Sequence, residues 1–274
     1  YFTVTKVRKT KYISKRLVLL RTIIDTDNSE VIVEENGKTR RFAMGTAEAF
    51  DATARAHLRV GWDTKYVYSF SWLGRPIIQL PDDMIRAQEL IYRVKPDVLV
   101  EIGVAHGGSL IYYASIMQAM SKGRVVGVDV EIRKDSRKAI EAHRMFDRIS
   151  LIEGDSVADA TVSLVKKQIS DSDVVMVFLD GNHTRKHILR ELELYSPLIS
   201  KGSYILAMDG IMEDLTGAPR SQPDWKYNNP AAAARDFIKQ NPHFEICEPG
   251  PQFNEGLVRK FVTYWPSAYI RRKV

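Results

Sequence analysis

The sequence predicts an α/β fold in which a doubly wound, mostly parallel sheet is covered by helices on both faces. Two observations carry this prediction. From Pro81 onward, helical stretches alternate with short apolar runs at the spacing of βα units. These runs, of which Val174–Leu179 is an example, are continuous in apolar character, as strands buried on both faces are. We therefore divide the chain into an N-terminal extension, residues 1–80, and a sheet domain, residues 81–274.

The N-terminal extension is predicted to hold a small β-element and a helix. Asn36-Gly37 between two alternating runs is a strong signal for a two-residue hairpin turn. Thr46 is a candidate cap for the helix that follows. In order, we expect strands over 17–24, 31–35 and 38–42, a helix over 46–60, and an aromatic segment from Trp62 to Trp72.

The sheet domain is predicted to alternate helices with strands. The helices are expected over residues 82–94, 108–120, 135–143, 157–169, 184–195 and 230–240. The strands are expected over residues 97–102, 124–130, 149–153, 173–180 and 203–208, with terminal strands near 244–248 and 260–264. Ligands of such sheets bind at the carboxyl ends of the strands, so the residues that follow each strand are the candidates for function.

The net charge of +6 is concentrated near the N-terminus. Residues 1–24 hold seven Lys or Arg and no acid, so residues 25–274 carry 33 basic residues against 34 acidic ones. This distribution argues against nucleic acid as the substrate. We expect the basic strip to be a solvated edge or a contact surface for an anionic neighbour, and the open hairpin edges favour a homo-oligomer.

The number of cysteines and the length of the apolar runs indicate the expected cellular compartment. The single cysteine, Cys247, excludes an internal disulfide and a multi-cysteine zinc site, and we expect a buried strand thiol in a reducing compartment, the cytoplasm. The longest apolar runs are of strand length, so no membrane span is predicted. The chain begins at Tyr1 and not at a methionine, which favours origin from a longer protein and leaves a leader open.

Three strand ends predict a cofactor of the adenosine type. Gly103 and Gly107 allow a tight turn before a helix N-terminus, with Glu101 placed near a cation and Ser109 near a carboxylate of the cofactor. An acid about 25 residues beyond such a turn binds a ribose diol, and Asp129 has this position. The next strand is followed by Asp155 and Ser156, which could line an adenine edge. The competing interpretation is ordinary capping of βα loops by Asp and Ser.

The fourth and fifth strands predict a metal site. They end at Asp180 and Asp209, and two carboxylates at neighbouring strand ends favour a hard divalent ion such as Mg²⁺. Such an ion would lower the pKa of a substrate hydroxyl, and His183 could accept the proton. Capping by the two aspartates, and a ligand or loop role for His183, stay open. His187 is expected to be a packing or supporting residue.

Several motifs of the chain resemble the cephalosporin hydroxylase/CmcI-type family, which includes rhamnosyl O-methyltransferases. The motifs are Glu101-Ile102-Gly103-Val104-Ala105-His106-Gly107-Gly108-Ser109-Leu110, Leu179-Asp180-Gly181-Asn182-His183-Thr184, Trp72-Leu73-Gly74-Arg75-Pro76, Asn229-Pro230 and Tyr264-Trp265-Pro266. The resemblance covers about residues 44–274 and implies a class I, Rossmann-like methyltransferase fold that uses S-adenosylmethionine, with a divalent metal, on hydroxyl oxygens of sugars or secondary metabolites.

The resemblance also assigns site residues. It places Glu101, Gly103 and Ser109 in the cofactor loop, Asp129 at the ribose and Asp180 as the first metal carboxylate. Metal-binding members have Glu-Asp at the fifth strand, whereas this chain has Met208-Asp209. The predicted set of metal ligands therefore lacks one acid relative to these members, and Glu213 or Asp214 could substitute for it.

We therefore predict a metal-assisted, S-adenosylmethionine-dependent O-methyltransferase acting on a sugar or a natural product. The acceptor pocket is expected to be walled by the aromatic segment Trp62–Trp72, by Arg75, and by Trp225, Tyr227 and Asn228. One alternative is a family member that has become a non-catalytic binding or scaffold protein, motivated by Met208. A hydroxylase, as the family name suggests, and a nucleic-acid methyltransferase are disfavoured by the βα alternation and by the charge distribution.

Overall fold

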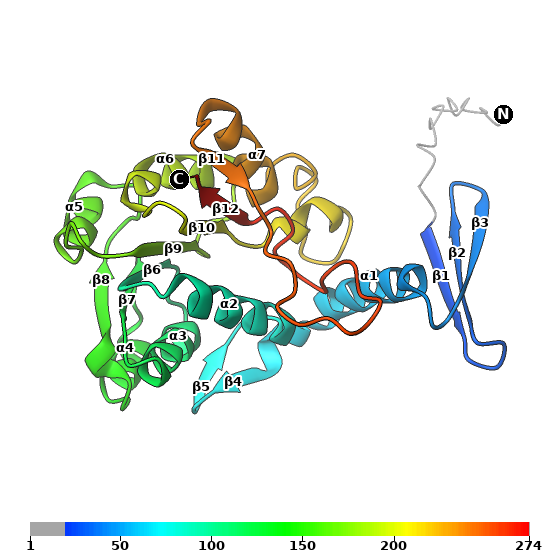
Figure 1. Cartoon of the computed structure of the whole chain (residues 1–274), viewed down its shortest axis with the longest axis horizontal. Helices are drawn as coiled ribbons and strands as arrows, with labels where there is room; N and C mark the ends of the chain where they lie inside the picture. The colour runs from blue at the N-terminus through cyan, green and yellow to red at the C-terminus, as the bar shows by residue number, and fades with distance from the viewer. Residues whose placement is uncertain (1–19, 274) are drawn as a thin grey trace, which may run out of the picture. The chain divides into compact units, whose positions relative to one another are not determined.

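The computed structural model describes residues 20–273, which fall into two compact units (Figure 1). Within the described part, the first unit comprises residues 20–56 and 257–259, and the second comprises residues 57–256 and 260–273. Residues 57–80, which the sequence analysis grouped with the N-terminal extension, thus pack in the second unit. Of the seven basic residues of the N-terminal strip, Arg21 is described and the other six lie outside the described residues.

The first unit is a three-stranded antiparallel sheet with the N-terminal half of a helix. The strands β1 (Leu20–Asp25), β2 (Glu30–Glu35) and β3 (Lys38–Ala43) lie in the order β1-β2-β3. The predicted hairpin is confirmed: Glu35 pairs with Lys38, and Asn36 and Gly37 have positive φ angles of 52° and 76°. Helix α1 (Ala47–Thr64) begins where the Thr46 hydroxyl accepts a hydrogen bond from the Ala49 amide at 3.3 Å.

The second unit is built around a seven-stranded sheet of order β11-β12-β10-β9-β6-β7-β8 (Figure 1). The strands are β6 (Val98–Ile102), β7 (Arg124–Asp129), β8 (Ile149–Glu153), β9 (Val175–Leu179), β10 (Tyr204–Ala207), β11 (Phe244–Ile246) and β12 (Tyr269–Arg272). From β8 to β10 neighbouring strands are parallel, whereas β12 runs antiparallel to both β10 and β11. The strand order reverses between β6 and β9, and such a switch point is where open α/β sheets bind ligands.

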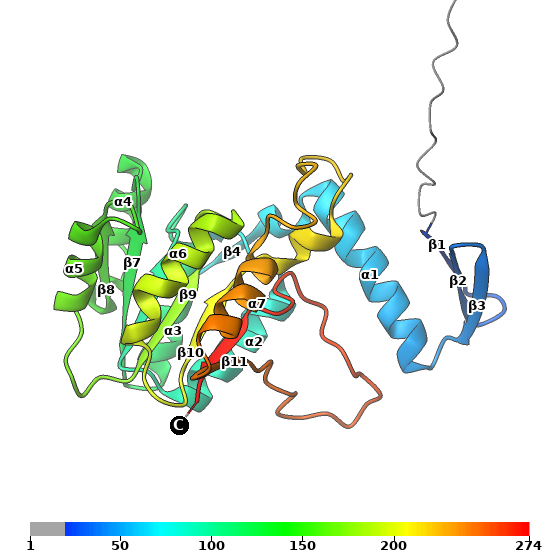
Figure 2. The ribbon, with the colours of Figure 1, turned by 90° about the horizontal axis from the view of Figure 1, so that it is seen from above.

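Helices cover both faces of this sheet (Figure 2). One face packs against α2 (Pro81–Val94), α3 (Gly108–Ala119) and α4 (Lys134–Glu141), and the other against α5 (Asp159–Lys167), α6 (Arg185–Tyr195) and α7 (Pro230–Gln240). Successive strand residues alternate between the two cores: Leu99 belongs to the first, and Val98 and Val100 belong to the second. The predicted sheet with two covered faces is therefore confirmed.

The aromatic segment and the connections contain short elements that the sequence did not indicate. A two-stranded hairpin forms from β4 (Phe70–Trp72) and β5 (Arg75–Ile77). Single turns of 3-10 helix cover Tyr66–Ser69, Phe146–Arg148, Ser196–Leu198 and Gly210–Asp214. The Trp72 indole donates a hydrogen bond to the Ser115 hydroxyl at 3.0 Å, which holds the hairpin on α3.

The predicted strand near residues 260–264 is wrong. This segment is irregular, and the strand lies further on, at Tyr269–Arg272. The reason is that the backbone of Tyr264 bonds outside any ladder: its amide donates to the Asp83 carboxylate at 2.8 Å, and its carbonyl accepts from the Ile211 amide at 3.1 Å. The segment is consequently a connection anchored on a buried carboxylate.

Two general expectations can be compared with the structure. No helix formed by residues 20–273 has the length and apolar character that crossing a membrane requires. Cys247 was expected to be buried within a strand, but it follows β11 as a partly exposed residue whose amide donates to the Tyr269 carbonyl at 2.8 Å.

Asn229 joins α7 to the loop before it, and we predict a stability cost when it is replaced. Its buried side chain accepts from the Ala232 amide at 2.8 Å and donates to the Trp225 carbonyl at 2.7 Å. Asn229→Ala should lower the free energy of unfolding by about 1–2 kcal/mol, measured by urea denaturation. Gln240→Ala, at an exposed position of the same helix, should change it by less than about 0.5 kcal/mol. Equal effects of the two substitutions would contradict the capping role.

Candidate functional site

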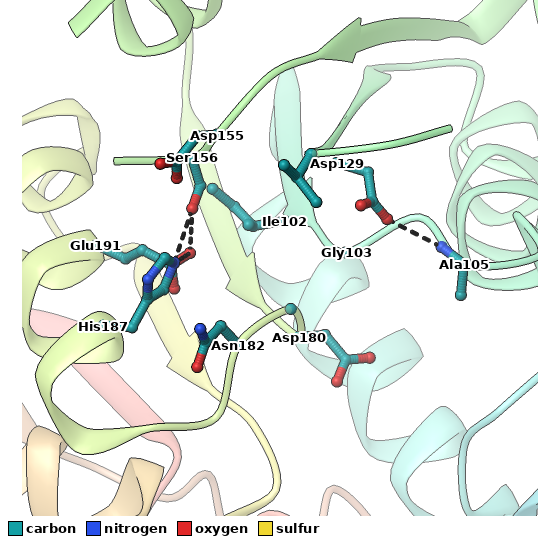
Figure 3. Close-up of a pocket in the computed structure, with 12 residues that line it drawn as sticks. Ile102, Gly103, Ala105, Asp129, Asp155, Ser156, Asp180, Asn182, His187 and Glu191 are labelled. Atoms are coloured by element: carbon teal, nitrogen blue, oxygen red, sulfur yellow. Dashed lines mark hydrogen bonds and ion pairs between the residues drawn. The ribbon is translucent and has the colours of Figure 1, made fainter. Parts of the chain in front are cut away.

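A cavity of about 570 Å³ opens at the carboxyl ends of β6 to β9 (Figure 3). Four of the seven residues predicted to bind a cofactor line it: Gly103, Asp129, Asp155 and Ser156. Asp180, Asn182, His187 and Glu191 form the side toward β9 and α6. The ends of the three strands that were predicted to bind a cofactor therefore line one cavity.

The loops around this cavity are joined through the backbone of Gly103. This residue has φ +105°, and a Cβ atom there would lie 2.3 Å from the Asp180 carbonyl oxygen. The Gly103 amide donates to the Val128 carbonyl at 2.8 Å, and the Asp180 amide donates to the Ile102 carbonyl at 2.8 Å. Glycine is required because both the φ angle and the contact exclude a side chain.

Asp129 is the last residue of β7 and is bonded to the loop after β6 (Figure 3). Its Oδ2 accepts from the amides of Val104 and Ala105 at 2.8 and 3.3 Å, and its Oδ1 accepts from the Glu131 amide at 3.3 Å. A carboxylate has about four acceptor positions, so capacity remains on the cavity side. The geometry suits the binding of a diol.

Glu101 is a fully buried residue of β6. Its Oε2 accepts from the Ser109 hydroxyl at 2.9 Å, while its Oε1 has no hydrogen-bond partner within residues 20–273. Burial raises the pKa of Glu101 well above its usual range, and the charges of Asp180 and Asp129 add to this. Such a group favours the approach of a cation. In this structure the Ser109 hydroxyl donates to Glu101, and its predicted contact with a cofactor carboxylate stays a prediction.

Ser156 belongs to a buried network that the sequence analysis missed (Figure 3). Its hydroxyl donates to Glu191 Oε1 at 2.6 Å, and His187 Nε2 lies 3.0 Å from the same oxygen. Glu191 is completely buried, and the hydrogen bond to it raises the pKa of His187. The signal was present in the sequence, because His187 and Glu191 are four residues apart on one helix face. His187 was predicted to be a packing or supporting residue; it bonds to Glu191 and also lines the cavity.

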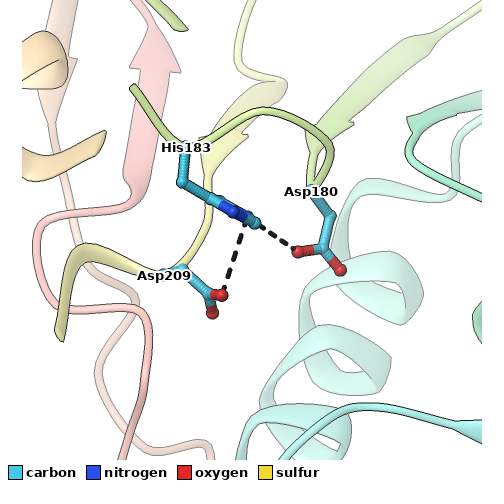
Figure 4. Close-up of side chains that lie close together, drawn as sticks. All are labelled: Asp180, His183 and Asp209. Carbon is cyan, nitrogen blue, oxygen red and sulfur yellow. Dashed lines mark hydrogen bonds and ion pairs between the residues drawn. The ribbon is translucent and has the colours of Figure 1, made fainter. Parts of the chain in front are cut away.

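A cluster of Asp180, His183 and Asp209 lies beside the cofactor cavity (Figure 4). His183 Nε2 is 3.4 Å from Asp180 Oδ1 and 3.6 Å from Asp209 Oδ2. Ligand atoms of all three lie within 4.8 Å of one another. Asp209 enters the cluster from the end of β10 in the left-handed region, at φ +61°, which Asp tolerates better than most residues. These are the residues predicted as metal ligands and proton acceptor.

The charges in this cluster depend on one another. Burial raises the pKa of Asp209 to about 6, against the opposing charge of His183. Burial alone would lower the pKa of His183, but the hydrogen bond to Asp180 and the charges of Asp209 and Asp180 outweigh it and raise the pKa to about 9. Without a bound ion, the imidazole is therefore protonated at neutral pH and carries the compensating positive charge.

The expected substitutes for the missing family glutamate do not join this cluster. Glu213 forms an ion pair with Arg235 at 2.8 Å, and Asp214 is exposed. Met208 is fully buried in the core beneath α2 and α3. The third potential ligand is His183, which comes from the neighbouring strand end.

Two further cavities extend from this cluster. One of about 180 Å³ is lined by Gly103, Ser109, Gln79 and the three cluster residues, and the other, of about 340 Å³, shares Gln79 and the cluster and is walled by aromatic residues. The aromatic residues of the larger cavity are Trp62, Tyr68, Trp225, Tyr264 and Trp265. Asp180 lines all three cavities, which therefore adjoin one another at this residue.

Several residues predicted for the acceptor pocket or the cofactor loop have other roles. Arg75 donates to the His106 carbonyl, with Nε at 3.1 Å, and so holds the cofactor loop. Tyr227 is 62% exposed, and Asn228 bonds to the Arg185 amide and to Asp224. Gly107 lies outside the three cavity walls, at the start of α3. These positions shape neighbouring loops and do not face the acceptor cavity.

Comparison with known proteins places this geometry in context. Residues 64–273 match the family model described as rhamnosyl O-methyltransferase/CmcI. A rhamnosyl O-methyltransferase of Mycobacterium leprae is 26% identical over 151 residues, which cover 54% of this chain and 62% of that protein. One of Mycobacterium tuberculosis is 28% identical over 180 residues, covering 63% and 71%. The chain thus spans less than two thirds of the M. leprae protein.

Solved structures agree on the fold. An apo structure of CmcI matches with a TM-score of 0.52 at 16% identity, over 76% of this chain and 77% of that chain. A CmcI structure with Mg and SAM matches with a TM-score of 0.51 at 16% identity, over 76% and 78%. The second unit therefore has the class I methyltransferase fold, as expected.

The close approach at Gly103 makes a prediction about stability. Gly103→Ala should lower the free energy of unfolding by at least about 2 kcal/mol more than Gly202→Ala, in guanidinium denaturation followed by tryptophan fluorescence. Gly202 is a matched control because its φ is +77° and a Cβ atom there would have no neighbour within 4 Å. The control should cost only about 1 kcal/mol, for the left-handed backbone. Similar costs for both would show that the contact with Asp180 can relax.

Proposed function

The chain belongs to the rhamnosyl O-methyltransferase/CmcI family, and from this premise we propose that it is an S-adenosylmethionine-dependent O-methyltransferase acting on a sugar hydroxyl, with a divalent metal at the acceptor. One observation carries the proposal: three consecutive cavities meet at Asp180, with acids suited to a cofactor on one side and aromatic walls on the other. This arrangement gives a cofactor and an acceptor separate entrances to a shared reaction point.

The cofactor half has features that fit S-adenosylmethionine. The first cavity is large enough for a nucleoside, and Asp129 at its edge would accept the two ribose hydroxyls. The unpaired Oε1 of buried Glu101, whose partner Ser109 lines the second cavity, would be satisfied by a positively charged amino group of the cofactor. The CmcI structure of the same fold that contains Mg and SAM supports this cofactor.

The reaction is a direct displacement. The acceptor oxygen attacks the methyl carbon in line with the sulfur, the C–S bond breaks, and its electron pair stays on the sulfur, which becomes a neutral thioether. The acceptor hydroxyl gives its proton to the neutral imidazole of His183, and the protein must align the oxygen with the methyl group and stabilise the deprotonated oxygen. The second cavity lies between the other two and shares Gly103 with the first and the carboxylate cluster with the third. A rigid cluster at this junction serves both needs.

The cluster also fits a divalent cation. Asp180 and Asp209 would hold the ion with their carboxylates, and the His183 imidazole lies within 4.8 Å of both. Oxygen ligands favour Mg²⁺ or Mn²⁺. A bound cation supplies Lewis acidity that lowers the pKa of an acceptor hydroxyl. In this state His183 would lose the proton that it carries in the metal-free cluster.

The acceptor half favours a sugar. Trp62 meets the Trp225 ring edge to face at 5.5 Å, and its indole donates to the Pro219 carbonyl at 2.8 Å, so the aromatic wall is fixed before an acceptor arrives. Such faces pack against the C–H side of a pyranose ring while the cluster binds its hydroxyls. Both mycobacterial relatives carry the name rhamnosyl O-methyltransferase, which supports a rhamnoside as the first acceptor to test.

Cofactor binding tests the first half of the proposal. S-adenosylhomocysteine should bind in isothermal calorimetry, and Asp129→Asn should raise its Kd about tenfold, because a charge-assisted acceptor for two hydroxyls is weakened. Glu131→Gln, two residues away at an exposed position, should leave the Kd within about twofold. Absence of binding to the wild-type protein would rule out this cofactor.

Removal of the metal tests the proposal that a divalent ion assists methyl transfer. Methyl transfer to methyl α-rhamnoside, measured by mass spectrometry, should fall at least tenfold on chelation with EDTA and return with Mg²⁺ or Mn²⁺. Asp209→Asn should reduce both the activity and the binding of Mn²⁺ measured by electron paramagnetic resonance. Asp214→Asn should change neither, because Asp214 is exposed outside the cluster. Full activity with EDTA present would exclude the metal but not the methyltransferase.

A further inference from the structure

Gln79 occupies the wall between the second and third cavities. It lies between β5 and α2, is only 4% exposed, and lines both cavities together with Asp180, His183 and Asp209. The first cavity, proposed for the adenosine part of the cofactor, does not include it. Gln79 is thus adjacent to the proposed reaction point from the acceptor side.

The two ends of its carboxamide differ in their surroundings. The Nε2 atom donates to the Tyr113 hydroxyl at 2.9 Å, while the Oε1 atom is buried without a hydrogen-bond partner among residues 20–273. Tyr113 is itself fully buried in α3, and its ring meets Phe178 of β9 edge to face at 5.2 Å. This hydrogen bond places the Oε1 atom on the side of the carboxamide away from the Tyr113 hydroxyl. A buried acceptor without a donor is unfavourable in the free protein and becomes satisfied when a ligand supplies one.

We propose that Gln79 is the specificity-determining residue of the acceptor site, where its Oε1 accepts a hydrogen bond from a second hydroxyl next to the one that is methylated. The inference rests on the proposed function and deepens it: the substrate class becomes a vicinal diol of a sugar ring. One hydroxyl lies at the Asp180–His183–Asp209 cluster and its neighbour reaches Gln79, while the ring packs against the aromatic wall.

The burial of Gln79 explains why this contact would select among acceptors. A site that hydrogen-bonds a substrate hydroxyl rejects the analogue without it, because the protein acceptor is then left unpaired. Alcohols with a single hydroxyl are therefore poor acceptors, even where they fill the aromatic cavity.

The test combines one substitution with deoxy acceptors. Gln79→Met keeps the length of the side chain and removes its oxygen; it should lower kcat/KM for methyl α-rhamnoside about tenfold at saturating S-adenosylmethionine. With one monodeoxy analogue, the wild-type protein and Gln79→Met should have equal kcat/KM within about twofold, which identifies the contacted hydroxyl. An equal loss on the rhamnoside and on every monodeoxy analogue would overturn the inference, and so would no loss at all.

Two measurements without turnover separate recognition from a structural role. For Gln79→Met, the Kd of S-adenosylhomocysteine should stay within about twofold of the wild-type value, and Tm should fall by no more than about 4 °C, because loss of the hydrogen bond to Tyr113 is offset by removal of an unpaired buried acceptor. Gln118→Met, exposed on α3 outside the cavities, is the matched control and should match the wild type in every assay. A larger fall in Tm together with a uniform loss on all acceptors would assign Gln79 to packing and overturn the inference.

The failure of the proposed function has a different signature. If the wild-type protein transfers no methyl group to any of these sugars, that function fails. Saturation-transfer NMR of methyl α-rhamnoside on the S-adenosylhomocysteine complex then tests Gln79 alone. Binding that Gln79→Met weakens supports the contact, whereas unchanged binding, or none, overturns it.

Discussion

The contact between the Gly103 backbone and the Asp180 carbonyl is the constraint on which the site depends. It joins the loops after β6 and β9 without an intervening side chain. The Gly103 amide also donates a hydrogen bond to the Val128 carbonyl, near the end of β7. Because Asp180 lines all three cavities, its position relative to the cofactor loop also sets where an acceptor must lie. This backbone contact would therefore fix the distance between a bound cofactor and a bound acceptor, because side-chain motion cannot alter it.

A shortage of positive charge is the second organising feature. Glu101, Asp180 and Asp209 converge from three neighbouring strands, and within the cluster only His183 offsets them. Burial makes isolated carboxylates costly, which is why the pKa values of Glu101 and Asp209 rise. A sulfonium cofactor and a divalent ion would both relieve this cost. The negative charge at the carboxyl ends of these strands would therefore stabilise both of the proposed ligands.

The sequence was sufficient where a residue follows directly from a strand. Asp129, Asp180 and Asp209 could be found because continuous apolar runs mark strand ends, and strand ends of a parallel sheet meet at one edge. Residues brought in by tertiary packing were not found: Gln79 precedes a helix, and Glu191 lies within one. The apolar run near Tyr264 resembles a strand, but Asp83, far away in sequence, takes up its backbone amide. The local sequence pattern cannot reveal a hydrogen-bond partner that is distant in sequence.

The insertion of β12 between β10 and β11 imposes an order of events on the growing chain. Strands β6 to β10 emerge from the ribosome as consecutive βα units and can pair as they appear, whereas β11 must wait for β12, which is synthesised later. Tyr264 and Trp265, which close the aromatic cavity, belong to the same late stretch. In a nascent chain the strand ends that line the first cavity can therefore come together before the aromatic wall of the third cavity is complete.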